Sequence, residues 1–557
     1  CDADCSLREA VIAANADAST DTVILPAGTY ALTIAGAAEN AGETGDLDIL
    51  GPVTIQGDAA ATTIIDAGGI DRVFHVESGS TRVVFANVTI RGGSAAGAGT
   101  DQNGGGIYAF RSLVTILNSV ITDNTAQGGG GGVDVNLDST NPSLAGLNLL
   151  GSTVSANTAM GSGGGGGILA GGRFPVRISH GVITGNHNTS GGGRGGGAFF
   201  AGSNSLDIVA SAFTDNTAAI GGGIAINQPI SARFRNTLIE GNTASSDGGG
   251  IHAVPRGGEN TLIETSAIRG NAARGGGALY VDGGAIAITD SELSGNSATG
   301  TGGAVSTIRT NLTIRGTTIT GNGATILAGG INVAFGSHLI ENSTLAGNTV
   351  TSAAGSNGVI GGGAIATSGS AVANMTLVNT TVADNVAPAG GSQLFCGSCK
   401  AGSVFLLRNT VITGPPGVPL CAVRFNSGPF TSEGGNLSGD ANCDLGDPTD
   451  QESVADMMLS ALAANGGPTD TRGLQAGSPA IGAAVAANCP AVDQRGFQRD
   501  GMCDSGAFEA NVSVDNFGCG ADLDGLRKQL GYVVEEILET PTVGDILYCL
   551  GGLAGAA

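Results

Sequence analysis

The sequence predicts an all-β fold, a parallel β-helix, because three observations agree. Glycine supplies 99 of 557 residues, more than twice its average share of about 7%, and it gathers in clusters rather than at the strict third positions of collagen. A unit of glycine cluster, short alternating segments and asparagine recurs along the chain. No helical stretch separates these units, and 41% hydrophobic against 13% charged residues leave enough apolar surface for a folded core.

The recurring unit fills residues 104 to 400. Each unit opens with glycines and a small apolar residue, at Gly104–Ile107, Gly165–Ile168, Gly195–Ala198, Gly221–Ile224, Gly248–Ile251, Gly275–Ala278 and Gly361–Ala364, with shorter forms at Gly131–Val133, Gly302–Ala304 and Gly329–Ile331. Each unit closes with one asparagine: Asn124, Asn157, Asn186, Asn216, Asn242, Asn271, Asn296, Asn322, Asn348 or Asn385. The mean period is about 29 residues, which is typical of solenoids and propellers.

Within a unit the hydrophobic residues alternate with polar ones. Leu312–Ile314 followed by Thr318–Thr320, and Leu206–Ile208 followed by Ala212–Thr214, show the pattern. Alternation over three to five residues predicts short strands with one face buried. Two or three such strands in about 29 residues describe one coil, and thirteen or so coils spaced at about 4.8 Å predict a rod of about 60 Å.

The asparagines and glycines have structural interpretations. Asparagines stacked at one corner can bond to neighbouring turns and to each other, as in amide ladders. The glycine clusters, which allow close backbone approach and left-handed turns, are expected at a corner opposite this ladder. They match neither a dinucleotide site, because no βαβ context surrounds Gly191–Gly197, nor calcium-binding nonapeptides, because no aspartate follows at a fixed offset.

The first fifteen residues predict a short capping helix. Ser6 and Glu9 have capping-box spacing. Four apolar residues fall on one helical face: Leu7, Ala10, Val11 and Ala14. Such a helix would cover the first coil, as caps do in repeat proteins. Strands are then predicted at 22–25, 30–34, 53–56, 63–66, 72–76 and 83–90.

The chain changes character after the repeat. Residues 1–400 form the predicted β-helix with its cap, and residues 401–510 its last coils and an irregular segment pinned by disulfides. Residues 511–557 predict a small helical module, because apolar residues recur at helical spacing: Leu523, Leu526, Leu530, Val533, Val534, Ile537 and Leu538. This module either caps the last coil or attaches the rod to a partner.

Ten cysteines lie outside the regular middle, which predicts disulfides in an oxidising compartment. Sequence neighbours pair most simply as Cys1–Cys5, Cys396–Cys399, Cys421–Cys443, Cys489–Cys503 and Cys519–Cys549, although other connectivities remain open. The CxxC spacing of Cys396 and Cys399 also fits a redox motif or half a zinc site.

Charge excludes several functions. The chain has 23 basic and 47 acidic residues, a net charge of −24, and its only lysines are Lys400 and Lys528. Binding to nucleic acid or to an anionic membrane surface is disfavoured, because both need a basic face. The sequence also has no apolar run of the roughly 20 residues that a transmembrane helix requires.

An enzyme would need a recognisable set of catalytic groups. A glycosidase needs two carboxyl groups about 5 to 10 Å apart, and the acids in or beside strands, expected to be solvated, are Asp207, Glu240, Glu264 and Asp290. A lyase needs a base and a cation, but the coil region before Lys400 has no lysine and its arginines are scattered without companion acids at a repeated offset: Arg233, Arg235, Arg269, Arg309 and Arg315. No catalytic residue is therefore assigned.

Metal and cofactor sites are equally sparse in the sequence. The histidines have no partners at metal-ligand spacing and are expected in surface or turn positions: His75, His180, His187, His252 and His338. Asp46 and Asp48, in the segment Gly45–Asp48, can bind calcium together with nearby carbonyls. No other cofactor is expected.

Two parts of the chain resemble a known family. The string CSLREA at Cys5–Ala10 resembles the CSLREA-type domain, and Gly477–Gly482, Val492–Gly496 and Cys503–Glu509 resemble the end of choice-of-anchor Q domain proteins. The resemblance implies a secreted or surface-displayed bacterial protein with a right-handed parallel β-helix and a variable C-terminal attachment device, but no reaction. The repeats are also similar to those of polymorphic outer-membrane adhesins.

In the family a β-strand usually precedes the cysteine motif, whereas here the chain starts at Cys1. We therefore expect an open sheet edge that a neighbouring subunit can fill by strand addition.

The expected function is structural or adhesive: a secreted or cell-surface rod in an extracellular or outer-membrane-associated assembly. Its expected partners are other surface proteins, copies of itself or polysaccharide. The alternative is a polysaccharide lyase or glycoside hydrolase that acts in a groove along the β-helix.

Overall fold

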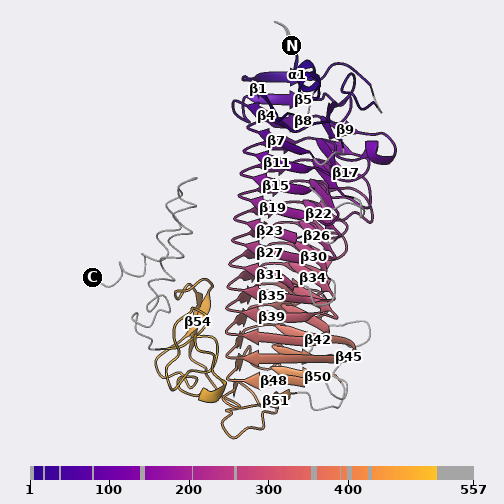
Figure 1. Ribbon diagram of the computed structural model, residues 1–557. Coiled ribbons are helices and arrows are strands. Elements are labelled where there is room, and N and C mark those ends of the chain that lie inside the picture. The colour runs from indigo at the N-terminus through magenta and orange to yellow at the C-terminus, as the bar shows by residue number, and fades with distance from the viewer. Residues whose placement is uncertain are drawn as a thin grey trace, which may run out of the picture.

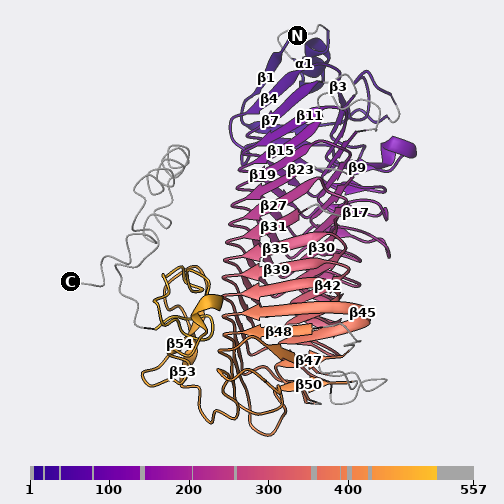
Figure 2. The ribbon, with the colours of Figure 1, turned by 60° about the horizontal axis from the view of Figure 1, so that its bottom comes forward.

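The chain forms an all-β solenoid, a right-handed parallel β-helix of about 13 turns, as the sequence predicts. The structure is a computed structural model, and it describes residues 5–510 except 17–18, 37–38, 78–80, 138–144, 203–204, 256–259, 353–360, 389, 398–403 and 425–429. Figures 1 and 2 show a straight stack of coils with the N-terminal helix at one tip. None of the helices among the described residues has the length and hydropathy needed to span a membrane.

The largest parallel sheet has 27 strands and holds the two longer strands of each coil. Its strands are β1 (Asp21–Leu25), β3 (Leu47–Ile49), β4 (Val53–Gly57), β6 (Phe74–Val76), β7 (Arg82–Ala86), β10 (Ile107–Phe110), β11 (Leu113–Leu117), β14 (Val133–Asn136), β15 (Gly146–Leu150), β18 (Ile168–Gly171), β19 (Pro175–Ser179), β22 (Ala198–Ala201), β23 (Ser205–Val209), β26 (Ile224–Asn227), β27 (Ser231–Arg235), β30 (Ile251–Val254), β31 (Asn260–Glu264), β34 (Leu279–Asp282), β35 (Ala285–Thr289), β38 (Val305–Ile308), β39 (Asn311–Arg315), β42 (Ile331–Glu341), β45 (Ile365–Val378), β47 (Leu394–Cys396), β48 (Val404–Arg408), β50 (Cys421–Val423) and β51 (Phe430–Ser432).

The second sheet has 15 strands, most of them of three residues. They are β2 (Gly28–Ala31), β5 (Thr63–Asp66), β8 (Thr89–Arg91), β12 (Val120–Thr122), β16 (Thr153–Ser155), β20 (Val182–Thr184), β24 (Ala212–Thr214), β28 (Leu238–Glu240), β32 (Ala267–Arg269), β36 (Glu292–Ser294), β40 (Thr318–Thr320), β43 (Thr344–Ala346), β46 (Thr381–Ala383), β49 (Val411–Thr413) and β52 (Leu437–Ser438). At about 4.8 Å per rung its first and last strands lie about 67 Å apart.

The third sheet has 10 strands, most of two residues, just after the asparagine positions. They are β9 (Ser94–Ala95), β13 (Thr125–Ala126), β17 (Thr158–Ala159), β21 (His187–Asn188), β25 (Thr217–Ala218), β29 (Thr243–Ala244), β33 (Ala272–Gly275), β37 (Ser297–Thr301), β41 (Gly323–Ala324) and β44 (Thr349–Val350). A 3₁₀ turn, η1 (Gly99–Gln102), lies between β9 and β10.

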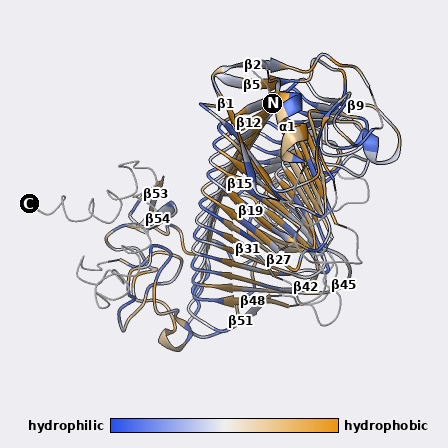
Figure 3. Ribbon diagram, turned by 45° about the horizontal axis from the view of Figure 1, so that its top comes forward, coloured by the Kyte–Doolittle hydropathy of each residue, from blue (hydrophilic) through white to orange (hydrophobic). Residues whose placement is uncertain are grey.

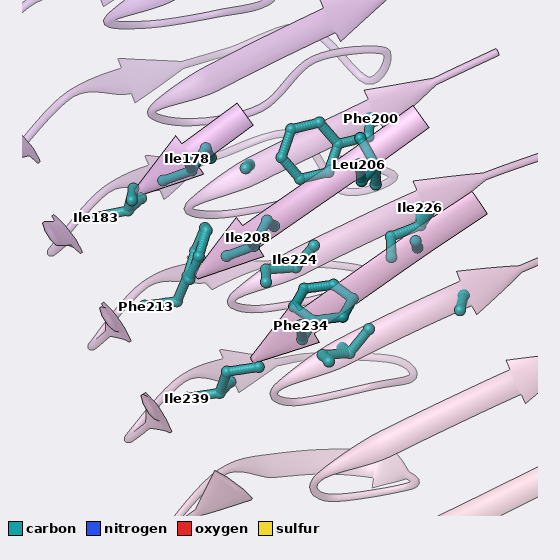
Figure 4. Close-up of a cluster of buried hydrophobic side chains, with 14 of the residues drawn as sticks. Ile178, Ile183, Phe200, Leu206, Ile208, Phe213, Ile224, Ile226, Phe234 and Ile239 are labelled. Carbon is teal, nitrogen blue, oxygen red and sulfur yellow. The ribbon is translucent and has the colours of Figure 1, made fainter. Parts of the chain in front are cut away.

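The interior of the rod is one continuous hydrophobic core. In register, Ile224 lies beside Ile251 and Phe234 beside Ile263, so like side chains stack from coil to coil. Figure 4 shows Phe200, Phe213 and Phe234 among the branched residues of these coils, and Figure 3 shows hydrophobic residues following the strands of the rod. Alternation therefore encodes the inward face of each strand, as expected.

One predicted strand is divided. The segment predicted as a single strand at 83–90 forms β7 and β8, because Asn87 between them has a φ of 57°. A left-handed residue ends a strand and turns the chain, and asparagine tolerates this conformation better than most residues. The same corner is formed by Asn236 and Asp290 in later coils, with φ values of 50° and 49°.

The ten asparagines form a single hydrogen-bonded column inside the rod. Asn216 donates from its backbone N–H and from Nδ2 to Asn242 Oδ1, both at 3.0 Å. Its Nδ2 also donates to Ile183 O of the preceding coil at 2.9 Å. The pattern repeats up to Asn385, which donates instead to Gln393 Oε1 at 2.7 Å.

The glycine clusters contact this column rather than lying opposite it, so that expectation is wrong. A Cβ on Gly223 would lie 3.0 Å from Cγ of Asn242, and one on Gly106 would lie 3.0 Å from Nδ2 of Asn124. Each coil closes where its asparagine side chain packs on the glycines that open the same coil. The linear sequence hides this contact because the two residues are separated by about two thirds of a coil.

Helix α1 (Leu7–Ala14) caps the first coils. Its capping box is present, with Ser6 Oγ accepting from Glu9 N and the Glu9 carboxylate accepting from Ser6 N. Leu7 and Val11 are buried in the core. Arg8 donates to the carbonyls of Gly42, Gly45 and Asp46 at 2.6 to 2.8 Å.

After β52 the chain leaves the stack and lies along its flank. Residues 440–510 include the antiparallel pair β53 (Leu459–Ala463) and β54 (Thr471–Leu474) and the 3₁₀ turn η2 (Ala486–Asn488). Thr344 Oγ1 of β43 donates to Gln494 Oε1 at 2.6 Å, and Figures 1 and 2 show β53 and β54 beside the lower coils. The predicted helical module at 511–557 lies outside the described residues.

Two disulfides join cysteines that are neighbours in the sequence, Cys421–Cys443 and Cys489–Cys503. Cys5 and Cys396 are also disulfide-bonded, and their expected partners Cys1 and Cys399 lie outside the described residues. So do both members of the expected pair Cys519–Cys549.

Candidate functional site

The acids considered for catalysis form ion pairs on the outside of the rod. Arg233 Nε lies 2.7 Å from Glu264 Oε2, and Arg269 Nε lies 3.0 Å from Glu240 Oε1. Asp207 Oδ1 has a longer contact, 3.9 Å, with Arg235 Nη2. The same cross-coil pairing joins Arg309 to Asp282 and Arg315 to Glu341.

These arginines have companion acids in space, although the acids follow or precede them at no single repeated offset in the sequence. Each partner lies one coil away, which is 26 to 31 residues for the hydrogen-bonded pairs. No short sequence motif reports such a separation. Because these pairs are exposed, each contributes less than about 1 kcal/mol to stability. Each pair nevertheless places an acidic group beside an arginine of the neighbouring coil.

Asp290 is the exception among the four acids. Burial, and then the charge of Glu264, raise the pKa of Asp290 above its ordinary value. A glycosidase requires two carboxyl groups near each other, one of them with a raised pKa. Asp290 also occupies the left-handed corner position described above, which accounts for an aspartate there without chemistry.

The histidines lie in three different environments. His180 and His187 are exposed, as expected, and His187 contacts Thr217 Oγ1 of the next coil. His252 stacks on Tyr280 with ring centroids 5.2 Å apart, and burial lowers the pKa of His252 to about 4. The expectation of a surface or turn position is wrong for His75 and His338, which are 7% and 3% exposed.

A cluster of buried ligand-type groups lies next to the N-terminal cap. Asp48 in β3 is the register partner of His75 in β6, and Asp46 directly precedes β3. Asp46, Asp48 and His75 each offer one ligand atom, and these three atoms lie within 4.8 Å of one another. Asp46 is 4% exposed and Asp48 is fully buried. We call these three residues the Asp–His cluster.

Defined contacts hold the Asp–His cluster in place. Arg72 Nε lies 2.6 Å from Asp46 Oδ2. Gly42 N donates to Asp48 Oδ2 at 2.8 Å, while Asp48 Oδ1 lies 3.0 Å from His75 Nδ1. Each carboxylate is thus fixed through Oδ2, and Oδ1 of Asp48 is directed at the imidazole.

The surroundings of the cluster are rich in carboxylates. Burial raises the pKa of Asp46 to about 7 although Arg72 opposes the shift. Asp134 is fully buried, its pKa is raised well above the ordinary value by burial, and its Oδ2 has no hydrogen-bond partner among the described residues. Asp101 lies 2.9 Å from Arg72 Nη2.

Sequence reasoning found Asp46 and Asp48 but missed His75 and Arg72. The missing signal is the coil period, since His75 follows Asp48 by 27 residues, one coil along the sequence. Spacing rules for metal sites look for ligands a few residues apart on one helix or loop. In a solenoid, ligands one period apart become neighbours.

The segments Gly477–Gly482, Val492–Gly496 and Cys503–Glu509 contact one another on the flank of the rod. The guanidinium of Arg495 lies 4.5 Å from the Phe497 ring centroid and 3.5 Å from that of Phe508. It also lies 2.7 Å from Asp493 Oδ2 and donates to the carbonyl of Glu509 at 2.6 Å. We call the described segment 456–510, held by this network, the flank clasp.

Comparison with known proteins adds no relative. No family model, curated protein or solved structure matches the chain.

Proposed function

We propose that the protein is a secreted or cell-surface structural or adhesive rod that works within an extracellular or outer-membrane-associated assembly. The observation that carries the proposal is the pairing of outward charges between coils. Arg233 pairs with Glu264 and Arg269 with Glu240 across adjacent coils, which supports a role for these charged groups in the stack of coils.

Other features of the chain support an extracellular location. Disulfides persist in oxidising compartments and are rare in reducing ones, and the described part of the chain contains Cys421–Cys443 and Cys489–Cys503. The net charge of −24 favours solubility and disfavours nucleic acid as a partner.

The N-terminal end of the rod offers a route to assembly. Among the described residues, β1 pairs with β4 alone, so one edge of β1 faces no other strand. Ile24 of β1 is 73% exposed. An exposed edge strand is a template for strand addition, which suits a copy of the chain or another surface protein.

The experiment tests for cleavage of polysaccharides and for a location on the cell surface. The purified full chain is incubated with polygalacturonate, alginate and a neutral xylan, and reducing ends and unsaturated ends are measured over a day. The proposal of a structural rod predicts no new chain ends with any of the three substrates. It also predicts that an antibody against the protein labels intact producing cells. New ends from one polysaccharide, abolished by a single acid substitution, would contradict the proposal.

The alternative is a glycoside hydrolase, and Asp290 beside Glu264 is the observation that favours it. If this pair is catalytic, Asp290→Asn and Glu264→Gln each abolish any glycosidase activity, whereas Glu240→Gln leaves it unchanged. The proposal of a structural rod predicts no activity in the unmodified chain and hence nothing for these variants to remove.

A further inference from the structure

We propose that the Asp–His cluster binds a divalent transition metal of the zinc class, with Asp46, Asp48 and His75 as its ligands. The proposal goes beyond the rod function, and it replaces the expected calcium site at Asp46 and Asp48.

The separations of the ligand atoms suit a small four-coordinate ion. Zinc bonds of about 2.0 to 2.1 Å place two tetrahedral ligands about 3.3 Å apart. Asp48 Oδ1 and His75 Nδ1 lie 3.0 Å apart, and all three ligand atoms lie within 4.8 Å of one another. No separation exceeds the tetrahedral value by more than about 1.5 Å, which side-chain movement can close.

Both carboxylates are oriented by a second contact, as ligating carboxylates usually are. Asp46 Oδ2 pairs with Arg72 Nε, and Asp46 Oδ1 has no hydrogen bond or ion pair among the described residues. Asp48 Oδ2 accepts from Gly42 N. Asp48 Oδ1 is buried and has no hydrogen-bond partner among the described residues. Its nearest polar contact is His75 Nδ1, which can carry a proton or a metal ion.

The imidazole decides the class of metal. Calcium and magnesium take oxygen ligands, whereas histidine is a preferred ligand of zinc and its neighbours in the transition series. Two carboxylates and one imidazole leave a fourth tetrahedral position, which water can fill.

Charge also favours a cation at this place. Five aspartates lie in or near the cluster: Asp46, Asp48, Asp71, Asp101 and Asp134. Two guanidinium groups, those of Arg8 and Arg72, lie among them. Buried carboxylates need compensation by a partner or a metal. A dication bound to Asp46 and Asp48 compensates two of these charges while Arg72 keeps its contacts.

A bound metal would fasten the N-terminal cap to the first coils. The Asp46 carbonyl accepts from Arg8 of α1 at 2.8 Å, and the Asp48 carbonyl accepts from Asn15 Nδ2 at 2.7 Å. His75 belongs to the next coil. One ion would therefore connect the cap, the first coil and the second.

The test uses the full chain after dialysis against chelator. Titration with Zn²⁺ is expected to show one equivalent bound and a raised melting temperature. Ca²⁺ at the same concentration is expected to show neither binding nor a change in melting temperature. Asp48→Asn and His75→Gln are expected to weaken Zn²⁺ binding at least tenfold, whereas the exposed controls His180→Gln and Asp207→Asn bind as the parent does. Binding of Ca²⁺ but not Zn²⁺, or full Zn²⁺ binding by His75→Gln, would overturn the proposal.

A second measurement covers variants that fail to fold. Co²⁺ added to the unmodified chain is expected to give the strong visible absorption of a tetrahedral site, and one equivalent of Zn²⁺ is expected to remove it. A weak octahedral spectrum, or no change on adding Zn²⁺, would also overturn the proposal.

Discussion

At the scale of single residues, the asparagine column and the glycine clusters form one device. Asn242 accepts two hydrogen bonds at Oδ1 and donates from Nδ2 to Phe213 O and to Asn271 Oδ1. Its side chain packs on Gly223 of the same coil. Asparagine and a small residue, glycine or alanine, therefore recur together because both are needed where the coil closes.

Two of the three glycines in the cluster Gly221–Gly223 are expected to differ sharply in how well they tolerate replacement by alanine. A Cβ on Gly222 would lie 2.5 Å from the backbone of Thr243 and 2.6 Å from Gly249 O, so Gly222→Ala should destabilise the protein by about 1 to 3 kcal/mol through overpacking. Gly223→Ala is the matched control, because alanine occupies the equivalent position at Ala278 and Ala304. Denaturant midpoints measure both, and equal shifts would contradict the account.

Replacement of an asparagine in the column should lower the free energy of unfolding more than replacement of an asparagine at the surface. Asn242→Ala leaves the buried N–H of Asn216 and the carbonyl of Phe213 without their partners, at about 1 to 3 kcal/mol for each unpaired group. Asn227→Ala, at the partly exposed end of β26, should change the free energy of unfolding by less than about 0.5 kcal/mol. Thermal melting of the two variants provides the comparison.

His338 predicts a dependence of stability on pH. It lies in the core between Leu312 and Met375 of the adjacent coils, both ring nitrogens lack a hydrogen-bond partner among the described residues, and burial lowers its pKa to about 4. Between pH 6.5 and 4 the unfolded chain binds more protons at this site. Stability is therefore complete above about pH 6.5 and falls by about 3 kcal/mol as the pH drops to 4.

Replacement of His338 isolates this contribution. His338→Leu is expected to flatten the pH dependence and to raise stability at pH 4.5, whereas His180→Gln, at an exposed turn, leaves both unchanged. The pKa of His252 is also lowered to about 4, so the part of the pH dependence that His252 causes remains in His338→Leu. Urea unfolding at pH 7 and 4.5 measures the effect, and an unchanged slope in His338→Leu would show that the imidazole is not buried as described.

At the scale of elements, the flank clasp, residues 456–510, lies against the second sheet. Asn379 Nδ2 donates to Asp504 O at 3.0 Å, and Ala507 N donates to Thr381 Oγ1 at 3.0 Å. Arg499 Nη1 lies 2.8 Å from Glu509 Oε2, and both side chains are buried. The contacts are polar and numerous, so the clasp depends on complete pairing.

Removal of the Arg495 guanidinium should detach the flank clasp from the rod and leave the coils folded. Arg495→Met leaves Asp493 as an uncompensated buried charge, which costs about 3 to 5 kcal/mol. Limited proteolysis should then cut within 456–510 while the fragment ending near β52 keeps its β-rich circular dichroism. Arg424→Met serves as the control for loss of an arginine outside the clasp, and rapid degradation of the coils in Arg495→Met would contradict a separable flank.

The sequence predicts the coils and the cap well because both follow local rules. Alternation over three residues identifies Ala212–Thr214 as a strand, and Ser6 with Glu9 identifies the start of α1. The flank clasp and the Asp–His cluster were beyond such rules. Gln494 meets Thr344 across 150 residues, and His75 meets Asp48 only because two coils stack in register.

At the scale of the whole molecule, the chain behaves as a single column of stacked coils. The core extends without interruption from Leu7 in the cap to Cys443 beyond the last coil, and the asparagine column runs inside it from Asn124 to Asn385. In the described part of the rod the strands of each coil pair with those of the coils directly before and after it, so the rod gains stiffness from nearest-neighbour contacts repeated along its length.

Hydrogen exchange along the full chain tests this central claim most directly. The account predicts that the backbone amides of the ladder asparagines, which donate to the next asparagine side chain, exchange slowly and as one block from Asn124 to Asn348, while the exposed corners exchange quickly. Rapid exchange of any ladder amide within the middle coils, at the rate of an unfolded peptide, would contradict a continuous column.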